Sequence, residues 1–311
     1  MRILFMGTPG FAVPCIEKLI ADGHEVCGVF TQPDKPRGRG LSLCPTPVKE
    51  AALRSGIAVY QPEGFKNGEA LKIINTLNPQ IIVVVAYGRI LPEAVLNIPA
   101  LGCINVHASL LPKYRGAAPM QRALIDGEEV TGIATMYMAK GIDTGDIILS
   151  EELLIGPNET FGELQDRMML LGAKLLSKTL TMIESGNAPR IVQDEVAFSY
   201  AKMIEKADCI IDFKKSALQV HNLVRGLSPS PSANTIICGI VLKVHKTEIT
   251  PLKSDKPAGT VIKADAEGIF VSCGDGIVIK FTQVQALGGK RMAVADYLRG
   301  HSIKAGCHFG G

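Results

Sequence analysis

The feature that most constrains the fold is a run of seven consecutive apolar residues at positions 81–87, IIVVVAY. A strand whose residues are all apolar has both faces buried, which is the situation of a central strand in a parallel sheet with helices on both sides. The run is far shorter than the roughly 18 residues that a membrane-spanning helix needs. It therefore predicts an α/β core and no membrane insertion.

Strand and helix patterns alternate on both sides of this run. Residues 1–6 and 25–31 have strand patterns, and apolar residues three and four positions apart predict a helix over 11–22 between them. Further helices are expected at 47–55, 68–77, 116–126 and 161–185, and further strands at 58–60, 102–107 and 131–137. This order predicts a doubly wound, mostly parallel sheet of the Rossmann type.

The pattern changes after Pro189. One amphipathic helix is expected over 213–225, and short strand-like runs separated by turn residues follow it. Strands spaced by about 8–12 residues with turn signals between them are typical of a small β-barrel. We therefore expect a catalytic domain over 1–188, a linker over 189–207 and a C-terminal β-barrel of the OB type over 208–311.

Charge is distributed unevenly along the chain. Residues 208–311 carry 13 Lys and Arg against 8 Asp and Glu, a net charge of +5, whereas residues 1–207 carry 20 against 22. A basic C-terminal third indicates a polyanionic partner. A solvated surface with a few extra lysines would give the same count.

Cysteine usage and the first residues indicate the compartment. The chain has eight cysteines but no Cys-x-x-Cys pair, so we expect neither a zinc site nor disulfides. The opening sequence MRILFMGTP lacks the layout of a signal peptide, because its apolar run is short and leads directly into a turn. These features predict a cytoplasmic protein.

Two polar residues, Asn105 and His107, stand at alternate positions of the strand expected at 102–107. Their side chains therefore project from one face, at the carboxyl end of the strand, where open α/β sheets bind ligands. An amide and an imidazole side by side are hydrogen-bond donors suited to a developing oxyanion. The alternative is that neighbouring loops simply satisfy both polar groups.

An acidic residue follows the strand expected at 131–137. Asp143 lies between Gly141 and Gly145, and small residues let the backbone approach a ligand closely. A carboxylate at such a position can orient a histidine and favour its charged form. The alternative is an Asx turn stabilised by Asp143.

Three basic residues are interleaved with Pro and Gly in the stretch 32–47, which we expect to be a long loop. Lys35, Arg37 and Arg39 could bind phosphate there. A solvated surface loop is the alternative.

Together these motifs resemble the methionyl-tRNA formyltransferase family over essentially the whole chain. The resemblance is carried by VVAYGRILP (84–92), INVHASLLPKYRGAAPMQRAL (104–124) and GIDTGDI (141–147). The Asn-x-His pair, the SLLP segment and the later Asp are shared by the wider group of formyltransferases that use 10-formyltetrahydrofolate. The RGAAP continuation, the TQPDKPRGRG loop and the C-terminal barrel are features of the tRNA enzymes.

The resemblance implies roles for individual residues. It implies a catalytic trio of Asn105, His107 and Asp143; a tetrahydrofolate-binding segment of Ser109, Leu110, Leu111 and Pro112; a pterin pocket lined by Arg89, Ile90 and Leu91; and tRNA contacts by Arg39 with Lys35 and Arg37. The implied reaction moves the formyl group of 10-formyltetrahydrofolate to the α-amine of initiator methionyl-tRNA, in a monomeric enzyme without a metal.

Two alternatives differ in the acceptor or in the activity. A formyltransferase for a small amine, such as an amino sugar or a ribonucleotide, would share the trio and the folate pocket, but the charge of +5 in the C-terminal third argues against it. A non-catalytic RNA-binding protein on a decayed enzyme scaffold is disfavoured by the intact Asn105, His107 and Asp143.

Overall fold

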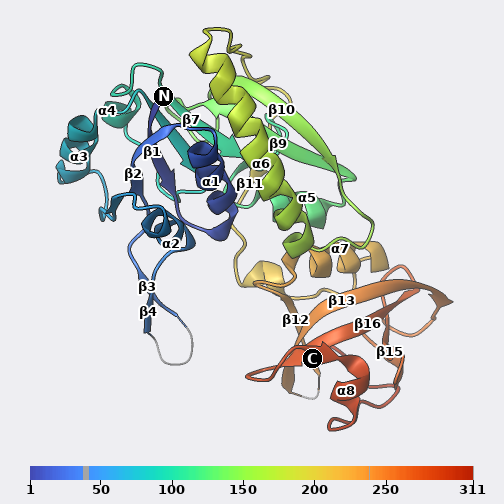
Figure 1. Cartoon of the computed structure of the whole chain (residues 1–311). Coiled ribbons are helices and arrows are strands. Elements are labelled where there is room, and N and C mark those ends of the chain that lie inside the picture. Colours follow the sequence, from blue (N-terminus) through green and yellow to red (C-terminus); the bar gives the residue numbers. More distant parts are fainter. Residues whose placement is uncertain (38–41, 238, 311) are drawn as a thin grey trace. The chain divides into compact units, whose positions relative to one another are not determined.

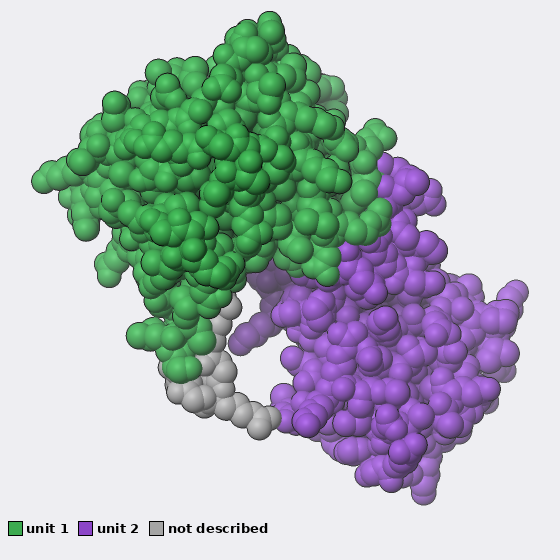
Figure 2. Space-filling view, in the orientation of Figure 1, with its two compact units in different colours: residues 1–116, 131–153, 165–201 green, residues 117–130, 154–164, 202–311 purple. Residues whose placement is uncertain are grey.

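The computed structural model describes residues 1–37, 42–237 and 239–310, which form two compact units (Figures 1 and 2). Unit 1 consists of Met1–Gly116, Thr131–Leu153 and Gln165–Ala201, and unit 2 of Ala117–Val130, Leu154–Leu164 and Lys202–Gly311. Unit 2 is therefore made of three separate stretches of the chain, the last of which begins at Lys202. The functional domain boundaries expected at 188 and 207 stay a prediction.

Unit 1 is built on a seven-stranded sheet with the order β10-β9-β7-β6-β1-β2-β5. Its strands are β1 (Arg2–Gly7), β2 (Glu25–Phe30), β5 (Val59–Tyr60), β6 (Ile81–Val85), β7 (Cys103–His107), β9 (Val130–Tyr137) and β10 (Ile147–Leu154). All neighbours from β5 to β7 are parallel, and β9 runs antiparallel to β7. The predicted doubly wound, mostly parallel fold is confirmed.

Strand β6 is the central strand in the order of the sheet, and every one of its residues is buried. Helices α1 (Val13–Ala21) and α6 (Phe161–Glu184) cover one face of the sheet, and α3 (Glu69–Leu77) and α4 (Glu93–Leu96) the other (Figure 1). Leu4 and Met6 of β1 pack with Ala70 and Ile74 of α3 in one apolar cluster. The remaining helix of unit 1, α2 (Pro47–Arg54), packs against α1.

Two details of unit 1 differ from the sequence prediction. The expected long loop over 32–47 contains a hairpin of β3 (Lys35–Arg37) and β4 (Ser42–Cys44), so that part of the prediction is wrong. Strand β10 was not predicted from the sequence; it lies at the edge of the sheet, and beyond its first two residues half-buried and exposed residues alternate. Neither element has a strand on both of its sides, and few of their residues are buried, which leaves a weak apolar pattern in the sequence.

Unit 2 contains an antiparallel sheet with the order β12-β13-β16-β15-β14, to which β17 adds beside β16. Its strands are β12 (Ala233–Ile237), β13 (Ile240–Lys253), β14 (Val261–Asp265), β15 (Gly268–Ser272), β16 (Ile277–Ala286) and β17 (Met292–Ala293), followed by α8 (Val294–Leu298). Residues near the C-terminus bridge both edges: Phe309 pairs with Ile237, and His308 pairs with Thr260 just before β14. These bridges close the sheet into the predicted small barrel.

Two helices pack closely within unit 2. Helix α7 (Ala217–Leu227) contacts α5 (Pro119–Asp126), and a Cβ atom at Gly226 would lie 2.8 Å from the Ile125 Cγ1 atom. Glycine is therefore required for the close approach of the two helices. Helix α7 begins later than the expected residue 213 because Ser216 and Gln219 form a capping box at its start. None of the described helices is both long and apolar enough to cross a membrane.

Candidate active site

The candidate site lies where strand β7 ends. Asn105 and His107 are two positions apart on this strand, which runs between β6 and β9 in the middle of the sheet. His107 is its last residue and is 6% exposed. Because alternate residues of a strand point to the same side, the amide and the imidazole share one face of the sheet.

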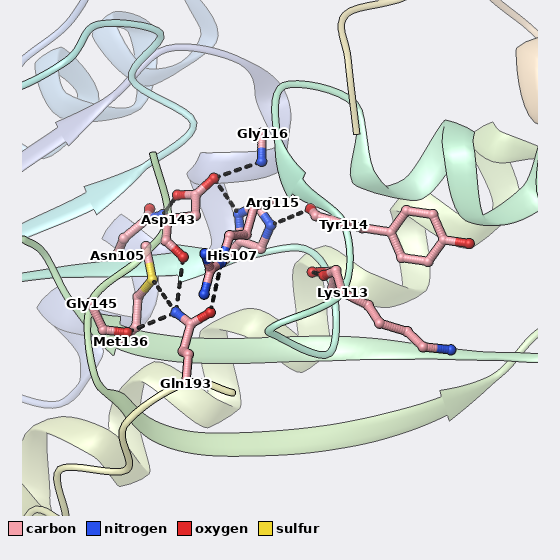
Figure 3. Close-up of polar contacts among 11 residues, drawn as sticks. Asn105, His107, Lys113, Tyr114, Arg115, Gly116, Met136, Asp143, Gly145 and Gln193 are labelled. Carbon is pink, nitrogen blue, oxygen red and sulfur yellow. Dashed lines mark hydrogen bonds and ion pairs between the residues drawn. The ribbon is translucent and has the colours of Figure 1, made fainter. Parts of the chain in front are cut away.

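The loop between β9 and β10 brings Asp143 to these two residues (Figure 3). Asn105 Nδ2 donates to Asp143 Oδ1 at 3.3 Å, and His107 Nδ1 lies 3.6 Å from Asp143 Oδ2. Asp143 Oδ2 also accepts a hydrogen bond of 2.8 Å from the backbone N–H of Gly116. The structure thus brings together the amide, the imidazole and the carboxylate that were predicted from the sequence as site residues.

Glycine is needed for the tight course of this loop. A Cβ atom at Gly145 would lie 1.7 Å from the carbonyl oxygen of Tyr137, which leaves no room for any side chain. Asp143 itself has a φ of 53°, in the left-handed region that non-glycine residues rarely adopt. The loop therefore depends on glycine at position 145 and on a sparsely populated backbone conformation at Asp143.

The second ring nitrogen of His107 also has a partner. His107 Nε2 lies 2.9 Å from the carbonyl oxygen of Tyr114, so this nitrogen carries the hydrogen and donates it. The imidazole therefore stands between a carbonyl oxygen and a carboxylate. Tyr114 has a φ of 60°, which directs the peptide into this arrangement.

The segment expected to bind tetrahydrofolate is partly packed into the protein. Ser109 is 1% exposed and donates to the carbonyl oxygen of Lys113 at 2.7 Å. Leu111 is buried in a small apolar cluster with Met136, and Leu110 and Pro112 are half-buried. The side chains of Ser109 and Leu111 shape the turn that carries Tyr114, and a ligand-binding role for the segment stays a prediction.

The three residues after β6 differ in their surroundings. Arg89 and Ile90 line a cavity of about 590 Å3 together with Phe65 and Pro92, whereas Leu91 is buried in the apolar core. The Nε atom of Arg89 is buried without a hydrogen-bond partner among the described residues. An apolar cavity beside such a guanidinium suits a flat aromatic ligand that carries a carboxylate.

The three basic residues expected to contact tRNA are only partly described. Lys35 is exposed in strand β3, and Arg37 ends that strand. Arg39 lies outside the described residues. Among the part of the chain that is described, no group of three or more His, Cys, Asp or Glu residues is placed to hold a metal ion.

Several partners of the trio were not found from the sequence. The Gly116 N–H and the Tyr114 carbonyl are backbone groups, which no side-chain pattern reveals. Gln193 donates to the carbonyl oxygens of Asp143 and Gly145 from the segment expected to be a linker. Nothing in its sequence neighbourhood distinguishes it from any other polar linker residue.

Comparisons with known proteins agree on the family. Residues 1–180 match the model of a formyl transferase, and residues 203–302 match the model of a formyl transferase C-terminal domain. The methionyl-tRNA formyltransferase of Clostridioides difficile (strain 630) is 51% identical over 310 residues, with complete coverage of both chains. That of Moorella thermoacetica is 46% identical, with 98% of each chain covered.

Solved structures show the same fold at lower identity. An N-formyltransferase from Helicobacter canadensis, in complex with folinic acid and dTDP-3-aminofucose, superposes with a TM-score of 0.69 at 21% identity, covering 90% of this chain and 98% of the other. HypX from Aquifex aeolicus, in complex with tetrahydrofolic acid, superposes with a TM-score of 0.67 at 15% identity. The match covers 96% of this chain and 47% of HypX. With both halves matched and full-length relatives about half identical, the chain belongs to the methionyl-tRNA formyltransferase family.

Proposed function

We propose that this enzyme transfers the formyl group of 10-formyltetrahydrofolate to the α-amine of initiator methionyl-tRNA at the site formed by Asn105, His107 and Asp143. The observation that carries the proposal is the convergence of these three side chains at the carboxyl end of β7. The full-length relatives are methionyl-tRNA formyltransferases, which supports the same acceptor.

The reaction needs the charge of a tetrahedral intermediate to be stabilised. The amine nitrogen forms a bond to the formyl carbon, the carbonyl oxygen becomes an oxyanion, and the bond from that carbon to the donor nitrogen then breaks. The amine loses a proton, and the released donor nitrogen gains one. Asn105 Nδ2 and His107 are the donors that stabilise the oxyanion, and loss of one such donor typically costs about 10²–10³-fold in rate.

The hydrogen bond from His107 to Tyr114 sets a condition on this mechanism. Because Nε2 already donates to the Tyr114 carbonyl oxygen, it reaches the oxyanion only by exchanging that acceptor for the substrate oxygen. Asp143 holds the other side of the ring and gives the imidazole a fixed orientation. The carboxylate also lies where it can take up the proton from the attacking amine, directly or through a water molecule.

The donor fits the cavity lined by Arg89, Ile90 and Phe65. The unpartnered Arg89 Nε suits a carboxylate of the folate, and the exposed Ile90 side chain offers an apolar contact. HypX and the Helicobacter enzyme hold tetrahydrofolic acid and folinic acid, which supports a folate donor for this fold. Leu91 and the segment 109–112 contribute by shaping the site.

The acceptor is a nucleic acid, and its phosphates meet the basic residues of the chain. Lys35, Arg37 and Arg39 of the β3–β4 region bind the acceptor stem, and the barrel adds its net charge of +5 over 208–311. We propose that the enzyme acts as a monomer in the cytoplasm, where translation is initiated.

Incubation with 10-formyltetrahydrofolate and methionyl-tRNA tests the proposal. The expected product is formylmethionyl-tRNA, detected as formylmethionine after hydrolysis of the ester, and Asn105→Ala and His107→Ala should strongly reduce its formation. Amino sugars and ribonucleotides serve as competing acceptors in the same assay. Formylation of a small amine but not of methionyl-tRNA would overturn the proposed acceptor.

A further inference from the structure

The segment 191–201, named the strap here, is attached to unit 1 at both ends. Ile191 forms an antiparallel bridge with Ile147, the first residue of β10. At the other end, β11 (Tyr200–Ala201) pairs in parallel with β8 (Arg115–Gly116). The strap therefore runs from the edge of the main sheet to the loop that carries Tyr114 and Gly116.

The strap places one buried amide against the loop of Asp143 (Figure 3). Gln193 is 5% exposed, and its Nε2 donates to the carbonyl oxygens of Asp143 at 2.9 Å and of Gly145 at 2.7 Å. Its Oε1 accepts from Arg115 Nε at 2.9 Å. A buried amide whose two donor hydrogens and acceptor oxygen all have partners is fixed in one orientation.

These hydrogen bonds act on a backbone segment in a sparsely populated conformation. Asp143 has a left-handed backbone conformation, in which its carboxylate contacts Asn105, His107 and the Gly116 N–H. Residues held in sparsely populated conformations persist when the surrounding structure fixes them. Gln193 supplies that restraint by binding the carbonyl groups of residues 143 and 145.

The same strap also fixes the opposite side of His107. The Ser199 hydroxyl accepts from the Tyr114 N–H at 2.9 Å, and the Ser199 carbonyl oxygen accepts from the Arg115 N–H at 2.8 Å. Tyr114 in turn accepts the hydrogen of His107 Nε2. Both oxygens that flank the imidazole thus lie on loops bound by the strap.

We propose that Gln193 is a positioning residue, which holds the backbone of Asp143 so that its carboxylate reaches Asn105 and His107. The proposal rests on the proposed function of the trio. The hydrogen bonds of Gln193 go to Arg115 and to the carbonyl oxygens of Asp143 and Gly145, and in this proposal it acts on the reaction through Asp143. A misplacement of about 1 Å at such a site can cost about 10²-fold in rate.

Two variants separate the hydrogen bonds of Gln193 from its packing. Gln193→Ala removes all of them, and Gln193→Glu keeps the acceptor for Arg115 but replaces the donors to Asp143 and Gly145 by a carboxylate oxygen. Val192→Ala, next in the chain and 80% exposed, is the matched control. Circular dichroism and thermal melting establish that each variant is folded.

We expect both Gln193 variants to lower kcat by about 10- to 100-fold, with the KM values for methionyl-tRNA and the folate changed less than about threefold. Their pH profiles of kcat should take the shape of the Asp143→Ala profile. Val192→Ala should remain within about twofold of the wild type. Because Gln193 acts through Asp143, Gln193→Ala should cost nearly nothing in the Asp143→Ala background.

Three results would overturn the proposal. One is a folded Gln193→Ala enzyme with wild-type kcat beside an impaired Asp143→Ala enzyme, which removes this inference and leaves the proposed function. Another is a loss that is fully additive with Asp143→Ala, which shows a structural role unrelated to the carboxylate. A fully active Asp143→Ala enzyme removes the proposed role of the trio and this inference together.

Discussion

Two sets of polar residues, one in each unit, act in opposite ways. In unit 1 the side chains of His107 and Asp143 are only 6% and 15% exposed, and each is held by partners on different loops. In unit 2 the Lys246 and Lys263 side chains are 50% and 42% exposed and pair with acidic residues at the surface. The first arrangement depends on the position of single atoms. Each exposed ion pair adds little, and what unit 2 contributes over a distance is the net charge of +5 over residues 208–311.

We expect single substitutions in the trio to have the largest effect on kcat. Asn105→Ala, His107→Ala and Asp143→Ala should each lower kcat by about 10²–10³-fold, because one substitution removes a donor or the group that orients it. The KM for the folate should change less than about threefold, since the cavity at Arg89 is not altered. Steady-state kinetics measures both quantities, and an Asn105→Ala enzyme with normal kcat would refute the donor role.

A methyl group in the Asp143 loop should have the next largest effect. Gly145→Ala places a carbon atom on the carbonyl oxygen of Tyr137, so the loop must move and carry Asp143 with it. We expect a loss of activity of at least about tenfold together with a lower melting temperature. Gly300→Ala, where a Cβ atom meets nothing within 4 Å, is the control and should leave the melting temperature unchanged.

Salt should separate the binding of the two substrates. Raising the salt concentration from about 50 to about 200 mM should weaken binding of methionyl-tRNA by at least about tenfold, because phosphate contacts release counterions. Binding of the folate should change less than about twofold over the same range. Filter binding and fluorescence titration measure the two affinities. Equal salt dependence of both affinities would show that phosphate contacts do not carry the binding of methionyl-tRNA.

The smallest predicted effect concerns stability at acid pH. Burial lowers the pKa values of His221 and His245 in unit 2, and nearby Lys243 and Arg291 lower that of His245 further. The unfolded chain therefore takes up protons first, and stability falls as the pH drops from about 6.5 through the folded pKa values. His245→Gln should have a shallower fall of melting temperature between about pH 7 and 5. A steeper fall than in the wild type would contradict this account.

The same contrast explains what the sequence could predict. The strand of Asn105 and His107 could be located because alternate polar residues at the end of an apolar strand leave a distinct pattern. Asp143 was identified by its glycine neighbours. The groups that hold these residues were missed because two are backbone atoms and the third, Gln193, comes into contact only through the tertiary fold. The edge strand β10 and the β3–β4 hairpin were missed because their pairing partners determine them more than their own residues do.

The discontinuous course of unit 2 has a consequence for recombining members of this family. Helix α5 belongs to unit 2, although two segments of unit 1, Thr131–Leu153 and Gln165–Ala201, follow it in the chain. A chimera joined at residue 202 would combine a foreign barrel with the native α5, and the packing of Ile125 against residue 226 would then be mismatched. Successful exchange requires that residues 117–130 and 154–164 travel with the barrel, so the transplantable module is larger than the last third of the chain.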